Sequence, residues 1–218
     1  MSSTSAGAGP RKLNLGCGFD IRDGYLNVDV NDFHKPDLVC DITNLLKLPS
    51  EYFDEVVAQD VLEHIPRAKT EAPLAERQRV TAPGGQLRLR VPNLLGLFNL
   101  FTQSDRQSRE AQRILVQCAY GTQAYEGDFH LTGFTPRLLV GQLVAAGFTN
   151  IKIATKDEWL MDVTAFKKSG RTVPLDTLLS NDDVCAVGWH RVEDHHGKML
   201  RWSSGRSVSP ASRRIMAI

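Results

Sequence analysis

Two glycines and a nearby aspartate are the residues whose types and spacing point most directly to chemistry. Gly16 and Gly18 follow a short apolar run, and Asp29 follows the next one. Glycines after a strand let the backbone approach a bound nucleotide, and a carboxylate on the next strand can accept hydrogen bonds from ribose hydroxyls. A dinucleotide site would need a third glycine at Ile21 and an acid about 20 residues after the first glycine. The pattern therefore favours an adenosine-containing cofactor that lacks a pyrophosphate.

Short apolar runs that alternate with helical segments predict the elements that hold these residues. We expect strands at 13–15, 25–28, 37–40, 53–58 and 86–91, and a helix at 66–80. This alternation is typical of a parallel sheet that is covered on both faces. The link from Gly18 to Leu26 is short, because a crossover normally needs about a dozen residues or more. We therefore expect an irregular turn there in place of a full first helix.

The second half of the chain carries a clear helix signal followed by a hairpin signal. Thr135 suits the N-cap of a helix at 135–146, Pro136 suits its first turn, and Gly147 suits its end. Strands are expected at 151–153 and 161–166, and their short connection predicts an antiparallel hairpin. Residues 1–11 predict a disordered tail and 169–184 a loop, and the polar, basic residues 185–218 predict turns.

Composition excludes several classes of protein. The chain has 218 residues, of which 42% are hydrophobic and 23% charged, and its net charge of +1 argues against nucleic acid or an anionic membrane as partner. Its four cysteines (Cys17, Cys40, Cys118 and Cys185) form no C-x-x-C pair, which suits a reducing compartment. The apolar stretch 91–101 is too short to span a bilayer, and the N-terminal residues do not form an export signal. We expect a soluble, cytoplasmic protein.

Several segments, in the right order, resemble the class I S-adenosylmethionine-dependent methyltransferases, especially the small bacterial type. They are Leu13-Asn14-Leu15-Gly16-Cys17-Gly18, Gly24-Tyr25-Leu26-Asn27-Val28-Asp29, Asp41-Ile42, the stretches 53–57 and 61–65, Pro83-Gly84-Gly85, His130 with Gly133-Phe134-Thr135, and Ala146-Gly147-Phe148. The resemblance covers residues 12–168, the expected cofactor-binding domain, and leaves 169–218 as an extension. It implies an α/β, Rossmann-like, doubly wound sheet of seven strands. This sheet would be mostly parallel with an antiparallel last strand, and helices would cover both faces.

The resemblance also implies a cofactor and roles for individual residues. The cofactor would be S-adenosylmethionine, with S-adenosylhomocysteine as product. The residues expected to bind it are Asn14, Gly16, Cys17, Gly18, Asp29, Val30, Asp41, Ile42, Gln59 and Asp60. We expect Tyr120, Gln123, Tyr125 and His130 to line the acceptor pocket. His130 and Asp60 are the expected catalytic residues, with His130 as the base because histidine titrates near neutral pH. Relatives often have His or Asn at the position of Asp60, where an acid would suit a cationic or amine-bearing acceptor.

Other functions remain open at the level of the sequence. The same cofactor could donate its aminocarboxypropyl arm, by transfer or cyclisation, in place of its methyl group. A subunit that binds the cofactor without catalysis is a further alternative, which the intact Gly16, Gly18 and Asp29 disfavour. An NAD-dependent dehydrogenase is disfavoured by the missing third glycine and the early acid. The sequence does not determine the acceptor or the oligomeric state.

Three histidines near the C-terminus do not form a recognisable metal site. The spacing of His190, His195 and His196 matches no metal-binding motif, so we expect a solvated loop and assign no metal ligand in the chain. Residues 188–202 show a faint similarity to small β modules that accompany glycan-processing domains. This similarity favours a sugar or polysaccharide precursor among the small-molecule acceptors.

Overall fold

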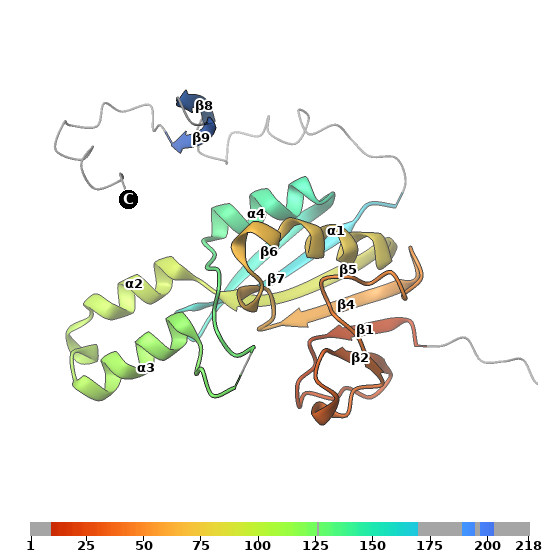
Figure 1. Cartoon of the computed structure of the whole chain (residues 1–218), viewed down its shortest axis with the longest axis horizontal. Helices are drawn as coiled ribbons and strands as arrows, with labels where there is room; N and C mark the ends of the chain where they lie inside the picture. Colours follow the sequence, from red (N-terminus) through yellow and green to blue (C-terminus); the bar gives the residue numbers. More distant parts are fainter. Residues whose placement is uncertain (1–9, 126, 170–188, 195–196, 203–218) are drawn as a thin grey trace, which may run out of the picture. The chain divides into compact units, whose positions relative to one another are not determined.

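Seven strands form one sheet with the order β3-β2-β1-β4-β5-β7-β6 (Figure 1). The computed structural model describes residues 10–125, 127–169, 189–194 and 197–202. The strands are β1 (Lys12–Leu15), β2 (Tyr25–Asp29), β3 (Leu38–Val39), β4 (Phe53–Gln59), β5 (Thr81–Pro92), β6 (Phe148–Lys156) and β7 (Leu160–Lys167). All neighbours from β3 to β5 pair in parallel, and β7 runs antiparallel to both β5 and β6. The predicted seven-stranded sheet with an antiparallel last strand is therefore confirmed.

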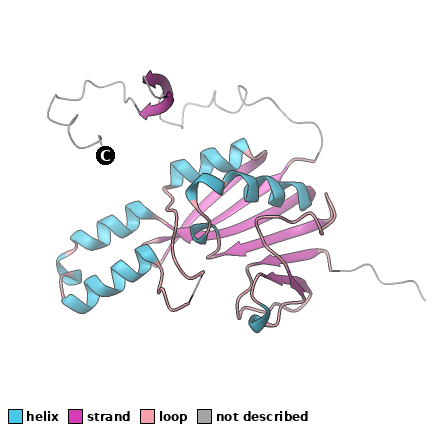
Figure 2. Cartoon of the chain, in the orientation of Figure 1, coloured by secondary structure: helices cyan, strands magenta, loops and turns pink. Residues whose placement is uncertain are grey.

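One face of the sheet is apolar and carries two helices. Alternate residues of neighbouring strands, such as Leu13, Val56 and Leu87, pair with one another and are fully buried. Because side chains alternate across a strand, these residues share one face. Helices α1 (Glu71–Val80) and α4 (Pro136–Ala145) contact each other and pack on β5 and β6 respectively (Figure 2). Their buried leucines and valines complete a single hydrophobic core with that face.

The opposite face is polar, and here the structure differs from the predicted layers. Lys12 pairs with Tyr25 and Glu55, and Glu55 pairs with Gln86, so these four side chains share the second face, where all remain at least partly exposed. The two helices that pack on the described sheet both lie on the other face. The expectation of helices on both faces is thus met on one face only. The physical reason is that the connections following β1 and β2 are too short to form crossover helices.

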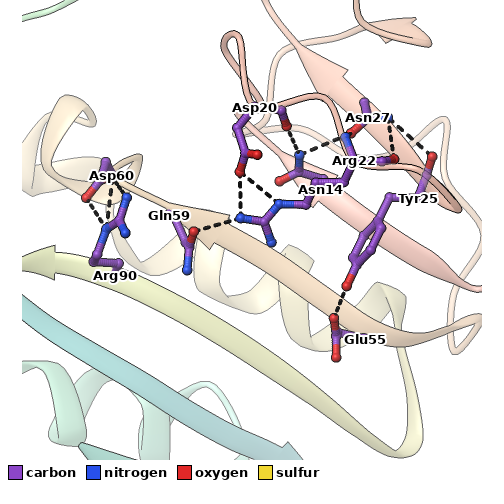
Figure 3. A network of polar contacts seen from close by, with 9 residues as sticks. All are labelled: Asn14, Asp20, Arg22, Tyr25, Asn27, Glu55, Gln59, Asp60 and Arg90. Atoms are coloured by element: carbon purple, nitrogen blue, oxygen red, sulfur yellow. Dashed lines mark hydrogen bonds and ion pairs between the residues drawn. The ribbon is translucent and has the colours of Figure 1, made fainter. Parts of the chain in front are cut away.

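Side-chain amides take the place of a helix in the connection from β1 to β2 (Figure 3). Asn14 donates to the carbonyl of Asp20 (2.8 Å) and to the side chain of Asn27 (3.1 Å). Asn27 in turn accepts from the backbone N–H of Arg22 (2.9 Å) and donates to its carbonyl (3.1 Å). Buried backbone groups need such partners, so the two asparagines fix the loop that carries Gly16 and Gly18. The expected irregular turn between Gly18 and Leu26 is confirmed.

The second half of the domain contains one predicted helix and two that the sequence analysis did not predict. In α4, Thr135 caps the helix by accepting from the N–H of Leu138 (3.3 Å), and the β6–β7 hairpin is antiparallel as predicted. The helices α2 (Leu94–Thr102) and α3 (Arg109–Tyr120) form a hairpin whose own small core contains Leu97, Leu100 and Leu115. Among the described helices, none has the length and apolar character needed to cross a membrane.

The chain divides into two compact units at residue 172. In the second unit, β8 (Trp189–Asp194) and β9 (Gly197–Trp202) pair as an antiparallel hairpin. The predicted solvated loop is therefore wrong for His190, which lies in β8, because the segment 189–194 finds a pairing partner in 197–202. His195 and His196 lie outside the described residues, as do most of the predicted tail and loop. Arg11, expected in the tail, pairs with Asp54 through its guanidinium.

Adjacent residues of β5 test the one-sided burial of the sheet. Leu87→Ala should lower the free energy of unfolding by about 2–5 kcal/mol, because it opens a cavity in the core. Arg88→Ala, one residue along on the exposed face, should change it by about 0.5 kcal/mol or less. Urea unfolding of both variants measures the difference. A similar loss in Arg88→Ala would mean that another layer covers the polar face.

Candidate functional site

Four parallel strands end at the same edge of the sheet, and the predicted cofactor residues lie in the loops that follow them. Gly16 and Gly18, after β1, have positive φ angles of 63° and 49°. A Cβ atom on Gly16 would lie 2.6 Å from Val61, so this glycine is needed for packing as well as for its φ angle. A Cβ atom on Gly18 would meet no protein atom within 4 Å. The space beside Gly18 is therefore open to a ligand.

Asp29, at the end of β2, is the centre of the predicted ribose site. Its Oδ2 accepts from the N–H of Gly18 (2.8 Å), and its Oδ1 accepts from the N–H of Asn31 (2.8 Å). Nδ1 of His34 lies 3.1 Å from the same Oδ1. The carboxylate is nearly buried, with Asp29 5% exposed. The structure thus brings Gly18 and Asp29 together, as expected from the sequence.

Aromatic rings surround His34 next to this carboxylate. The ring centroids of Phe19 and Phe33 lie 4.6 and 3.9 Å from that of His34. Tyr125, from the segment between α3 and α4, approaches Phe33 at 6.3 Å. Phe19 and Phe33 are nevertheless largely exposed. Tyr125, predicted as an acceptor residue, therefore lies on the side of Asp29.

A cavity of about 440 Å³ adjoins the end of β3. Val30 and Asp41, both predicted to bind the cofactor, line it together with Cys40 and Leu46. Oδ1 of Asp41 accepts from the N–H and the hydroxyl of Thr43, which fixes the carboxylate. Three other predicted residues do not line this cavity: Ile42 packs against the hydrophobic core, Cys17 is buried, and Asn14 braces the loop. Burial and nearby Asp29 raise the pKa of the Cys17 thiol to about 11.

Gln59 and Asp60 end β4 and are each held by an arginine (Figure 3). The side-chain oxygen of Gln59 accepts from Arg22 (2.7 Å). Asp60 has a positive φ angle of 54°, and both of its carboxylate oxygens accept from Arg90, with Nε at 2.9 Å from each. The sequence analysis did not foresee this arginine. Its charge neutralises that of Asp60.

A second cavity, of about 250 Å³, lies between the end of β4 and the α3–α4 segment. Asp60, Glu63, His130 and Trp159 are among the residues that line it. Of the predicted acceptor residues, His130 is the one that lines this cavity. Tyr120 and Gln123 are exposed; Tyr120 contributes its backbone carbonyl, which accepts from the N–H of His130 (3.0 Å).

Burial changes the titration of two groups in this second cavity. Desolvation raises the pKa of the Glu63 carboxyl to about 8, and the nearby Asp60 adds to the increase. Desolvation also lowers the pKa of His130, with His64 contributing in the same direction. Glu63 and His64 stand in the segment 61–65 that supported the family resemblance, but the sequence analysis assigns them no catalytic or binding role and favours a structural one for His64. The sequence signal that could have identified them is their position in a motif that resembles the family.

Comparison with known proteins agrees with this arrangement. A family model described as a methyltransferase domain matches residues 7–89. Among the curated proteins searched, none matches. S-adenosylmethionine-dependent methyltransferase structures from Methanosarcina mazei and Archaeoglobus fulgidus are each 17% identical to this chain, with TM-scores of 0.51 and 0.50. These alignments cover 73% and 72% of this chain, and 92% and 85% of the other.

A third structure, of a "possible exported protein" from Bordetella parapertussis, is 13% identical with a TM-score of 0.53, and the alignment covers 72% of this chain. The alignment spans 61% of the Bordetella protein's own length. At such identities the three structures establish the fold alone. Over residues 7–89 the chain is therefore similar to the methyltransferase-domain family, and its strand order with an antiparallel last strand is that of a Rossmann-like methyltransferase fold.

Proposed function

We propose that this protein transfers a methyl group from S-adenosylmethionine to a small, neutral, hydroxyl-bearing acceptor. The observation that carries the proposal is the position of Asp29 and the open space beside Gly18. One cavity adjoins the end of β3, next along the sheet from β2, and the other lies beyond the end of β4. Open α/β sheets bind their ligands at this edge, where the strand order reverses.

The residues around Asp29 fit the adenosine part of this cofactor. A carboxylate has about four lone-pair positions, and two backbone N–H groups occupy two of them, so hydroxyl donors can use the remainder. Since Asp29 is nearly buried, we expect a covering ring of Phe19, Phe33 or His34 to move when ribose binds. Val30 and Asp41 would hold the adenine in the cavity beyond β3.

The acceptor would occupy the cavity that His130 lines. When bound, the cofactor supplies an electrophilic methyl group, and the protein orients the acceptor and excludes water. Asp60 is paired with Arg90, and Asp128 accepts from the hydroxyl of Thr122 and the N–H of Ala124 (3.4 Å). The third lining carboxyl, Glu63, is unpaired at Oε2, but burial raises its pKa to about 8, which favours its neutral form. A cationic acceptor would therefore gain little from these three groups. We therefore favour a neutral acceptor, such as a sugar unit, over the amine that Asp60 suggested in the sequence.

We assign His130 as the general base that accepts the proton of the acceptor's hydroxyl group. Its Nδ1 is buried without a hydrogen-bond partner among the described residues, and the side chain lines the cavity. Burial lowers the pKa of this imidazole and so favours the neutral form, in which one ring nitrogen has a free lone pair. A positioned imidazole in this state can accept a proton from a hydroxyl group during transfer. Asp60 would act indirectly here, as a wall of the same cavity that is held in place by Arg90.

Binding of S-adenosylhomocysteine tests the cofactor assignment. Calorimetric titration should give a dissociation constant of about 1–10 μM, or −8 to −7 kcal/mol. NAD, the control, should show no heat of binding because the loop lacks the third glycine of a pyrophosphate site. Binding of NAD alone, or of neither compound, would contradict the proposed function. Turnover can then be sought by mass spectrometry, where the product mass separates methyl from aminocarboxypropyl transfer.

Loss of the Asp29 charge should weaken cofactor binding. Asp29→Asn should raise the dissociation constant for S-adenosylhomocysteine by about tenfold or more, since hydrogen bonds to a charged acceptor are worth about 1.5–3 kcal/mol. Asp23→Asn is the matched control, because it removes an equal charge from an exposed position of the preceding loop. Thermal unfolding of both variants separates binding from loop stability. Equal affinity in the two variants would remove Asp29 from the ribose site.

Replacement of His130 should affect catalysis more than cofactor binding. With an acceptor found by the mass screen, His130→Asn should lower kcat by about 100-fold or more, the usual contribution of a general base. Its affinity for S-adenosylhomocysteine should stay within about twofold, because His130 lines the acceptor cavity. Arg113→Gln, an exposed change on α3, serves as control. An unchanged kcat in His130→Asn would exclude the histidine as base.

A further inference from the structure

Three side chains with metal-binding atoms converge beside the acceptor cavity, although one of them is distant in sequence. Two of the three, Glu63 and His130, line the cavity. Glu63 and His64 belong to the short 3-10 helix at 62–64, and His130 lies in the segment between α3 and α4. One ligand atom of each lies within 4.8 Å of the other two. The rings of His64 and His130 meet edge to face, with centroids 5.0 Å apart.

Two of these side chains bury a polar atom that has no partner among the described residues. Glu63 is 1% exposed, and its Oε2 accepts no hydrogen bond. Nδ1 of His130 is unpartnered as well. A buried unsatisfied acceptor costs about 1–3 kcal/mol, and such groups are rare in folded proteins. Since both acceptor atoms belong to residues that line one cavity, we expect a cation or a hydrogen-bond donor to bind between them.

Backbone hydrogen bonds hold the cluster in place. Nδ1 of His64 lies 3.1 Å from the carbonyl of Phe129, to which it donates, so Nε2 keeps a free lone pair. The carbonyl of Glu63 accepts from the N–H groups of Leu131 (2.7 Å) and Thr132 (3.1 Å). These bonds join the 3-10 helix to the residues on either side of His130. Metal-binding histidines are commonly oriented by such a bond from the other ring nitrogen to a carbonyl.

We propose that Glu63, His64 and His130 bind a divalent transition-metal ion with one coordination position open to the acceptor cavity. Two imidazole nitrogens and one carboxylate oxygen are the donor set of catalytic zinc sites, whereas magnesium and calcium prefer oxygen ligands. In a tetrahedral site with bonds of about 2.1 Å, the ligand atoms lie about 3.4 Å apart, so side chains now within 4.8 Å must close by up to about 1.4 Å. The ion would provide the partner that Glu63 and His130 lack.

This site does not depend on the proposed methyl transfer, because binding of the ion needs these three side chains alone. A metal ion and a proton exclude each other at Nδ1 of His130, so the role of base belongs to the metal-free protein. In the loaded protein, the open position would bind a hydroxyl oxygen of a molecule in the cavity, as catalytic metals do. The ligand class is thus a hydroxyl-bearing molecule in either form.

Cobalt is a suitable probe because its visible absorption reports the coordination geometry. The full-length protein, stripped of metal with a chelator, should bind one equivalent of Co²⁺ with tetrahedral or five-coordinate absorption, and Zn²⁺ should displace it. Glu63→Gln and His64→Asn should each weaken binding by about 100-fold. Glu63→Gln keeps the size of the side chain, and circular dichroism verifies that both variants are folded.

A triple variant controls for the other histidines of the chain. His190→Asn, His195→Asn and His196→Asn, combined, should leave cobalt affinity unchanged. Absence of binding to the full-length protein, or binding that is lost in the triple variant and kept in Glu63→Gln, would overturn the proposed site. Calorimetry with S-adenosylhomocysteine on the same samples reports on the proposed function separately. Cobalt binding without binding of this compound would support the metal site and contradict the methyltransferase.

Discussion

The carboxylate of Asp29 is the interaction on which the cofactor half of this domain depends. It accepts one hydrogen bond from Gly18, after β1, and one from Asn31, after β2. A single side chain therefore joins the ends of two neighbouring strands, whose connection is too short for a crossover helix. Asp29 thus holds the two loops together even without a ligand. The cofactor affinity of an Asp29 variant must therefore be interpreted together with the variant's stability.

The use of side chains in place of a helix also explains why the second face of the sheet is polar. With no helix between β1 and β2, the backbone of the connecting loop is satisfied by Asn14 and Asn27, which project from the polar face. Side chains on that face can therefore be polar, and Arg22 reaches across it to Gln59 at the end of β4. Figure 3 shows this link from the loop after β1 to Gln59, whereas Asp60 and Arg90 form a separate pair.

The strands, the absent first helix and the Gly18–Asp29 pair could be predicted, because each follows from local sequence: apolar runs, connection length and glycine spacing. The convergence of Glu63 and His64 with His130 could not, since it arises from hydrogen bonds between segments about 65 residues apart. Arg90 was missed for a related reason. A charged residue in a predicted strand shows its partner only when the register of β4 and β5 is known.

The boundary of the family match separates the loops of the proposed cofactor site from most residues of the proposed acceptor cavity. The match ends at residue 89, within β5, and contains the loops around Gly18, Asp29 and Asp41. His130 and Trp159 come from the part beyond it, where α2 and α3 have a separate small core. The hairpin thus has a core apart from that of the sheet, while two hydrogen bonds to the carbonyl of Glu63 hold the segment after His130 beside the 3-10 helix at 62–64. Specificity for the proposed acceptor therefore has to be sought after residue 89, together with Asp60 and Glu63, the residues of the matched part that line the cavity.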